Sequence, residues 1–170
     1  MLNQKTIILL RHAKSSWASS ELDDYDRPLN ERGLNDTVKC EKLYKTLTNS
    51  KCQIISSSAK RTKQTAKKTC HYFNCSEQDI VWTKALYLAS AKEMLTVINQ
   101  QPNLEDTLVV VGHNNGISRL AQLLTNSNEI AHMPTLSAVK INFEADNWNE
   151  IFLGNGVLES FFYPKMIKPT

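Results

Sequence analysis

Two short apolar runs, residues 5–10 and 107–111, constrain the fold of this chain more than any other feature. Both are rich in β-branched residues, which is typical of strands that are covered on both faces. Between them, apolar residues recur at helical spacing, as at Cys40, Tyr44 and Leu47. Strands that alternate with helices predict a largely parallel sheet with helices on both faces, which is a three-layer α/β/α sandwich.

The remaining elements follow the same alternation. Asn30 is a plausible N-cap for the first helix, and Ser90 with Glu93 matches a capping box at the start of a later one. A turn is expected at Gly154-Asn155-Gly156, before the segment 158–163. The further expected strands are 52–56, 80–82, 138–143 and 150–153, and the expected helices are 31–47, 59–73, one that starts at about 91, and 117–124.

Length and composition exclude several classes of protein. The 170 residues fit one domain, 1–170, and 41% hydrophobic with 22% charged residues is the composition of a folded protein. A formal net charge of +3 is too small to predict a nucleic-acid or membrane-surface partner. The first apolar run is too short for a signal peptide or a membrane span, so we expect a cytoplasmic protein. The four cysteines form no CxxC pair, and we expect them to be reduced and mostly buried.

Cationic and imidazole side chains follow three of the expected strands. Arg11 and His12 close the first, Arg61 comes just after the second, and His113 follows the run 107–111. Taken singly, each is more often a structural histidine or one charge on a solvated helix. In parallel sheets, however, the carboxyl ends of the strands meet at one edge, where ligands collect. Two arginines and two histidines would repel one another there without an anion, and a dianionic phosphoryl group would satisfy all four.

The residues around these positions resemble the histidine phosphatase superfamily, and more narrowly its short SixA-type phosphohistidine phosphatases. The resemblance covers residues 9 to about 143 and rests on four segments in order, which are LRHAKSSW (10–17), DRPLNERG (26–33), SSSAKRTKQTA (56–66) and VGHNNG (111–116). It implies a phosphoglycerate mutase-like fold, His12 as the nucleophile, and Arg11, Arg61 and His113 as the phosphate pocket. It also implies hydrolysis through a phosphohistidine intermediate on His12, with neither a metal nor another cofactor.

Three further residues are candidates for substrate binding. Ser15 lies in the loop after the proposed nucleophile, although an exposed loop serine is a slightly better interpretation. Arg27 lines the same mouth or forms a surface ion pair with Asp24 or Asp26. Asn114 either donates to phosphate from the start of the next helix or caps that helix.

The general acid that many members of the superfamily place after the third strand has no counterpart here. Leu88 stands at or near that position, so an alkoxide leaving group would depart poorly. A phosphorylated imidazole can be protonated on its other ring nitrogen, so this absence favours protein phosphohistidine as the substrate. Four other acids could still swing in from a loop or a helix end, but solvated surface charge is the better interpretation of each, namely Asp23, Asp24, Asp26 and Glu93. The chain also has no spare segment that could cap the pocket, which predicts an open site.

Several alternatives remain at this stage. The protein could be a general phosphatase of small phosphorylated substrates, or a non-catalytic module that binds phosphate, since Ala13 stands where glycine is commoner. The basic run 60–68 lacks the interleaved aromatics of an RNA site. The spacings of zinc sites, serine hydrolases and P-loops do not occur. The oligomeric state is left open.

Overall fold

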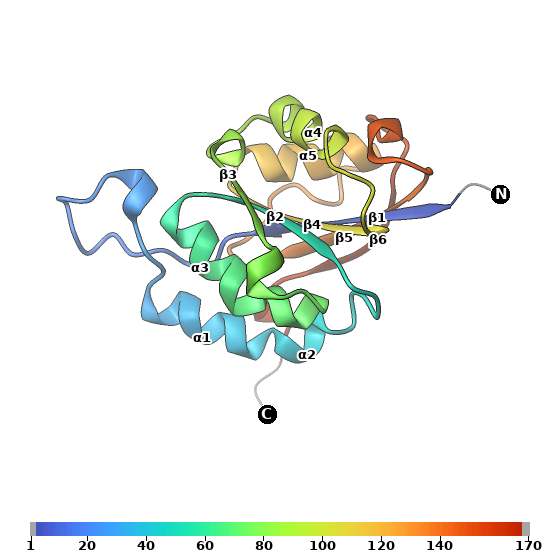
Figure 1. Cartoon of the computed structure of the whole chain (residues 1–170). Helices are drawn as coiled ribbons and strands as arrows, with labels where there is room; N and C mark the ends of the chain where they lie inside the picture. Colours follow the sequence, from blue (N-terminus) through green and yellow to red (C-terminus); the bar gives the residue numbers. More distant parts are fainter. Residues whose placement is uncertain (1–2, 168–170) are drawn as a thin grey trace.

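The computed structural model describes residues 3–167 and shows a six-stranded sheet between two layers of helices (Figure 1). The strands lie in the order β3-β2-β4-β1-β5-β6. Their bounds are β1 Gln4–Arg11, β2 Gln53–Ser57, β3 Val81–Thr83, β4 Thr107–Gly112, β5 Ala138–Glu144 and β6 Val157–Phe162. The helices are α1 Glu31–Lys39, α2 Glu41–Tyr44, α3 Lys60–Thr69, α4 Ala91–Asn99 and α5 Gly116–Thr125. No helix in this part of the chain is long and apolar enough to cross a membrane.

The side chains of β1 alternate between two separate cores, as the twofold period of a strand requires. Ile7 and Leu9 pack in a core with residues of α4 and α5, whereas Ile8 and Leu10 pack in a second core with Cys40, which follows α1, and with residues of α2 and α3. Figure 1 shows α4 and α5 on one side of the sheet and α1 to α3 on the other. The expected three-layer α/β/α sandwich is therefore confirmed.

The sheet is mixed but mostly parallel. β1, β2, β3 and β4 pair in parallel, and β5 pairs antiparallel with both β1 and β6. The parallel strands end at one edge in close register, because Arg11 pairs with Gly112 and Ser56 pairs with Val111. His12, Ser57 and His113 follow these pairs, so the topology delivers all three to the same edge.

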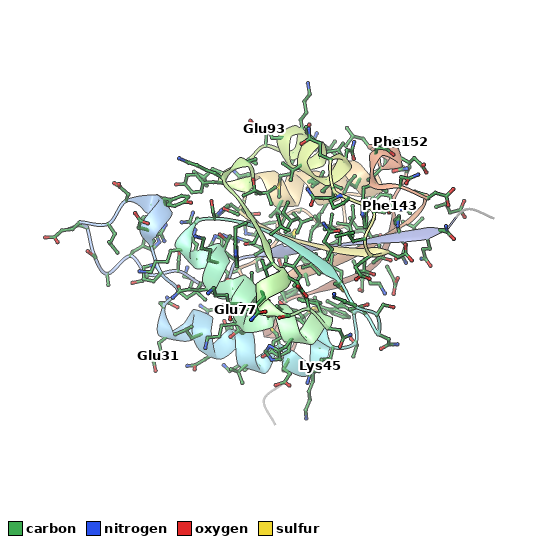
Figure 2. The ribbon with its side chains drawn as sticks, viewed as in Figure 1. Glu31, Lys45, Glu77, Glu93, Phe143 and Phe152 are labelled. Carbon is green, nitrogen blue, oxygen red and sulfur yellow. The ribbon has the colours of Figure 1, made fainter. Side chains whose placement is uncertain are left out.

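Most of the helix predictions hold, with changes at the ends. The expected helix 31–47 is interrupted at Cys40 and continues as the short α2, and the expected helix 59–73 ends at Thr69 and is followed by a 3-10 turn. The side chain of Asn30 caps α1, and Ser90 and Glu93 form the predicted capping box of α4. Glu93 projects from the helical layer, whereas Phe143 lies within the fold (Figure 2).

The predicted strand 150–153 is wrong. A 3-10 turn, Trp148–Glu150, occupies the start of this region, and a loop follows it. Trp148 and Ile151 are buried in the core on the α4 and α5 side, while Phe152 is exposed. The apolar residues therefore fill the core from a loop, which a run of four residues cannot distinguish from a short strand.

Candidate active site

His12 and His113 leave neighbouring parallel strands and lie side by side. The register of β1 and β4 brings them together, and their ring centroids are 5.2 Å apart. Both side chains are buried. The edge of the sheet therefore holds two imidazoles that come from positions 101 residues apart in the chain, as the sequence predicted.

The hydrogen bonds of His12 fix which ring nitrogen carries its proton. Nδ1 lies 2.7 Å from the carbonyl oxygen of Ala13, and a carbonyl can only accept. Nδ1 therefore carries the hydrogen, and the lone pair of the neutral ring is on Nε2. The backbone N–H of Ala13 donates to Thr65 Oγ1 over 3.0 Å, which holds this residue in place. Ala13 has no positive φ, so its conformation does not require a glycine.

His12 is neutral over a wide pH range. Burial is the main cause that lowers its pKa, and the guanidiniums of Arg61, Arg11 and Arg27 lower it further, to about 3, against the opposing effect of the Ala13 hydrogen bond. A neutral imidazole with a free lone pair is the nucleophilic form. At neutral pH His12 Nε2 therefore carries an unprotonated lone pair, which can act as a nucleophile.

Arg61 stands directly against the nucleophilic nitrogen. It lies in the first turn of α3, and its Nε donates to His12 Nε2 over 3.4 Å. Its side chain is almost fully buried, with 3% of the residue exposed. The interpretation of Arg61 as one charge on a solvated basic helix is therefore wrong, because the helix turns this residue away from its lysine-rich face.

Arg11 and His113 each keep a polar atom that is buried without a partner among the described residues. Arg11 Nη1 donates to the carbonyl of Met133 over 2.7 Å, but its Nε has no hydrogen-bond partner. His113 Nε2 shares a hydrogen bond of 2.8 Å with Ser57 Oγ, and its Nδ1 has no partner. Buried polar atoms of this kind cost free energy, so they mark a place where a polar ligand would be stabilised.

Arg27 is a buried residue of this site. Its Nη2 donates to Ser15 Oγ over 2.6 Å, and its Nε donates to the carbonyl of Ser16 over 2.9 Å. The expectation of an exposed loop serine is wrong for Ser15, which is buried by these contacts. The exposed ring of Trp17 covers the guanidinium of Arg27 at 3.1 Å from ring centroid to Cζ. We call Arg11, Arg27 and Arg61, with the rings of His12 and His113, the cationic pocket.

Asn114 contacts the rim of the cationic pocket. Its Nδ2 donates to the carbonyl of Met133 over 3.1 Å and lies 3.2 Å from His132 Nδ1, while its Oδ1 accepts from Ser118 Oγ. The N-cap of α5 is the next residue, Asn115. Asn114 thus fastens the loop around 132–133 to α5, and a contact from Asn114 to phosphate stays a prediction.

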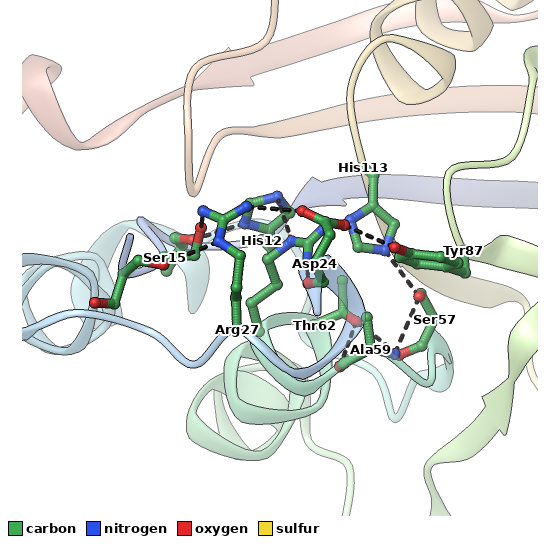
Figure 3. A network of polar contacts seen from close by, with 12 residues as sticks. His12, Ser15, Asp24, Arg27, Ser57, Ala59, Thr62, Tyr87 and His113 are labelled. Atoms are coloured by element: carbon green, nitrogen blue, oxygen red, sulfur yellow. Dashed lines mark hydrogen bonds and ion pairs between the residues drawn. The ribbon is translucent and has the colours of Figure 1, made fainter. Parts of the chain in front are cut away.

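Asp24 is the main correction to the sequence prediction for this site. It is not a freely solvated charge, because Oδ1 accepts from Arg27 Nη1 over 2.8 Å and Oδ2 accepts from Arg61 Nη2 over 2.9 Å. The hydroxyl of Tyr87 also donates to Oδ2 over 2.7 Å. Burial raises the pKa of Asp24, but these hydrogen bonds outweigh it and hold the pKa at about 2. Figure 3 shows this network from Ser15 through Arg27 and Asp24 to Tyr87.

Comparison with known proteins agrees with this geometry. The profile of the histidine phosphatase superfamily (branch 1) matches residues 7–86, which include His12 and Arg61. The solved structure of a putative phosphohistidine phosphatase SixA from Nakamurella multipartitia superposes with a TM-score of 0.79 at 21% identity, over 95% of this chain and 97% of that one. Residues 7–86 of this chain therefore match the histidine phosphatase superfamily, branch 1.

Two further proteins are similar to this chain along most of its length. A putative SixA structure from Agrobacterium tumefaciens has a TM-score of 0.77 and 25% identity, over 94% of this chain and 98% of that one. An uncharacterised chloroplastic protein of Arabidopsis thaliana is 29% identical over 89% of this chain and 72% of its own length. The fold is thus of the phosphoglycerate mutase-like, histidine phosphatase type.

Two glycines in the motifs of this chain are explained by close backbone contacts. A Cβ on Gly33 would overlap the carbonyl oxygen of Lys14, and a Cβ on Gly116 would overlap the carbonyl oxygen of Ala89. The first contact packs the start of α1 against the segment that follows His12. The second packs the start of α5 against the loop that carries Tyr87, so both glycines shape the site.

Sequence reasoning missed Ser57 and Tyr87. A signal for Ser57 existed, since it ends the second strand next to the strand that leads to His113. Tyr87 gave none, because its neighbours form no motif. The structure places the Tyr87 ring edge-on to His113 at 5.5 Å, whereas Leu88, where an acid was sought, is 55% exposed and has a positive φ of 48°.

Within residues 3–167, histidine, cysteine and carboxylate side chains form no group of three or more that could hold a metal ion. The three guanidiniums of the cationic pocket suit an anion and would repel a metal cation. Its residues therefore fit a phosphoryl ligand best.

Proposed function

We propose that this protein is a phosphatase that forms a phosphohistidine intermediate on His12 and acts on protein phosphohistidine. One observation carries the proposal. The lone pair of His12 Nε2 lies 3.4 Å from Arg61 Nε, next to buried polar atoms of Arg11 and His113 that have no partner in the described chain. A nucleophile beside fixed positive charge and polar atoms without a partner is an arrangement that suits phosphoryl transfer.

The first step is a displacement at phosphorus. The lone pair of His12 Nε2 forms a new P–N bond while the bond from phosphorus to the leaving group breaks, and the leaving group takes the electron pair. The proton on Nδ1 stays in its hydrogen bond to Ala13, which stabilises the charge that the ring acquires. Water then attacks the phosphohistidine, the P–N bond breaks, and orthophosphate leaves with His12 neutral again.

The substrate class follows from how the leaving group gains its proton. Asp24 is a carboxylate at neutral pH, since its pKa is held at about 2, and Leu88 carries no acid. An alcohol therefore finds no efficient proton donor in the site. A substrate phosphohistidine can be protonated on its second ring nitrogen near neutral pH and leaves as a neutral imidazole. We infer that phosphohistidine is cleaved faster than phosphate esters.

The rim of the pocket supports a substrate that is displayed on a protein. Trp17, which covers Arg27, is 75% exposed, and Leu88, which follows Tyr87, is also exposed. Exposed apolar side chains beside a pocket are typical of surfaces that contact a partner protein. This rim would accept a folded protein that presents one phosphorylated side chain.

Hydrolysis of a phosphohistidine peptide and of p-nitrophenyl phosphate by the wild type tests the proposal, with His12→Ala as the inactive variant. His71→Ala removes an exposed imidazole elsewhere on the surface and is the matched control. We expect turnover mainly of the peptide, its loss in His12→Ala and full activity in His71→Ala. Equal efficiency on the ester would instead indicate a general phosphatase. Phosphate binding without turnover would indicate a non-catalytic module.

A further inference from the structure

We propose that the carboxylate of Asp24 is an internal counter-anion of the cationic pocket, which the phosphoryl group of the substrate must displace. This inference rests on the proposed function and adds a residue that sets substrate affinity. It predicts that Asp24 opposes anion binding, although it lies among the residues that would bind the anion. The reverse role, in which Asp24 positions the arginines for phosphate, predicts the opposite sign for Asp24→Asn below.

The contacts of Asp24 are those that an anion in this pocket would make. Its two carboxylate oxygens bridge the guanidiniums of Arg27 and Arg61, and Tyr87 adds a hydroxyl donor. The main-chain oxygen of Asp24 also accepts from Arg61 Nη1 over 2.5 Å. Both terminal nitrogens of Arg61 thus face Asp24 rather than a ligand. Two guanidiniums with a neutral hydroxyl donor form a typical oxyanion site.

Asp24 is close to the position that a reacting phosphoryl group must take. Arg61 spans the space between the two, because its Nε contacts His12 Nε2 at 3.4 Å while its Nη2 contacts Asp24 Oδ2 at 2.9 Å. A phosphoryl group aligned with His12 Nε2 would therefore share a single guanidinium with the carboxylate. The phosphoryl group and the Asp24 carboxylate are both negative, so they would repel each other across this guanidinium. The repulsion is strong where water is partly excluded.

The net charge of the cationic pocket favours replacement of the Asp24 carboxylate by a phosphoryl group. Three arginines and one carboxylate give the resting pocket a formal charge of +2, with both histidines neutral. A dianionic phosphoryl group that replaces Asp24 meets three guanidiniums without a competing anion. The carboxylate then moves into water, which costs little because its side chain is already 40% exposed.

The segment that carries Asp24 is built so that it can move. Asp24 lies in a 3-10 turn of three residues, Asp24–Asp26, with no buried residue, and exposed residues 17–23 precede it. Figure 1 shows this part of the chain, between β1 and α1, projecting away from the body of the molecule. Besides the contacts of Asp24, the hydroxyl of Tyr25 donates to Ser58 Oγ over 2.7 Å. The ring of Tyr25 also packs edge-on against Tyr87, with ring centroids 5.0 Å apart. A few polar contacts and this aromatic contact therefore hold the turn over the pocket.

Isothermal titration calorimetry of orthophosphate binding to the full chain tests the inference without any need for turnover. Asp24→Asn keeps the size of the side chain and removes its charge. Asp26→Asn removes the same charge two residues away, at an exposed position, and controls for the change in net charge. We expect Asp24→Asn to bind phosphate on the order of tenfold more tightly, from the loss of two partly exposed ion pairs that oppose binding. Asp26→Asn should change the affinity less than twofold.

Tyr87→Phe is a second test variant, because it leaves the charges of Asp24, Arg27 and Arg61 in place and removes only the hydroxyl that donates to Asp24. Because bound phosphate would take over the same hydroxyl donor, Tyr87→Phe should change phosphate affinity much less than Asp24→Asn. Unchanged or weaker binding in Asp24→Asn would overturn the inference, as would an equal gain in Asp26→Asn. If the wild type binds phosphate and Asp24→Asn binds it more tightly, yet neither hydrolyses phosphohistidine, the proposed function fails and the counter-anion role stands.

Discussion

Acid should destabilise this protein through its two buried histidines. Burial is the main cause that lowers the pKa of both His12 and His113, to about 3, and neighbouring charges lower it further. An unfolded histidine has a pKa of about 6.5, so the unfolded state binds protons that the folded state excludes. The contribution of these two histidines to the free energy of unfolding is therefore fully present above about pH 6.5 and is lost as the pH falls towards 3.

The size of the effect follows from the two pKa values. Between pH 7 and pH 5, protonation of one unfolded histidine lowers the free energy of unfolding by about 2 kcal/mol when the folded ring stays neutral. His12 and His113 together should contribute about 4 kcal/mol. Asp24 contributes with the same sign, but mainly below pH 4, because its pKa is lowered to about 2.

Urea unfolding at pH 7, 6 and 5 measures this loss. His113→Gln keeps a polar group near Ser57 and removes one titrating ring, so the loss between pH 7 and pH 5 should shrink by about 2 kcal/mol. His71→Gln, at an exposed position, is the matched control and should leave the pH dependence close to that of the wild type. The same pH dependence in His113→Gln and in the wild type would refute the reasoning.

Further predictions concern the pocket and its packing. Arg61→Lys should lower kcat on a phosphohistidine peptide by roughly 10²–10³, because lysine cannot reproduce the fork that faces His12 Nε2, and wild-type rates would contradict this. Ser57→Ala removes the partner of His113 Nε2 and should lower kcat. The free energy of unfolding in urea should change by no more than about 1 kcal/mol. Gly33→Ala should cost about 1–3 kcal/mol in urea unfolding, because its Cβ would overlap Lys14; an unchanged midpoint would show that α1 shifts freely.

The sequence predicted those features that depend on a residue's own type or on its close neighbours in the chain. The strand ends placed Arg11, His12 and His113 at one edge, because the carboxyl ends of parallel strands meet at the same edge of a sheet. The capping box of α4 and the buried strand β4 were likewise local signals. These features depend on neighbours in the sequence or on a simple rule of topology.

The rest depended on contacts that no local pattern encodes. Asp24 looks like any acidic loop residue, and only the fold shows that Arg27, Arg61 and Tyr87 converge on it. The segment 150–153 is apolar enough for a strand, but it fills the end of a core instead. In both cases long-range packing overrides what the local residues favour.

Trapping of the phosphorylated intermediate tests the central claim most directly. The protein is mixed with a phosphohistidine peptide, quenched in alkali, where phosphohistidine survives, and mapped by mass spectrometry. We expect one acid-labile phosphoryl group on His12, its absence in His12→Ala, and its retention in His71→Ala. A phosphoryl group on another residue, or peptide hydrolysis that persists in His12→Ala, would contradict it.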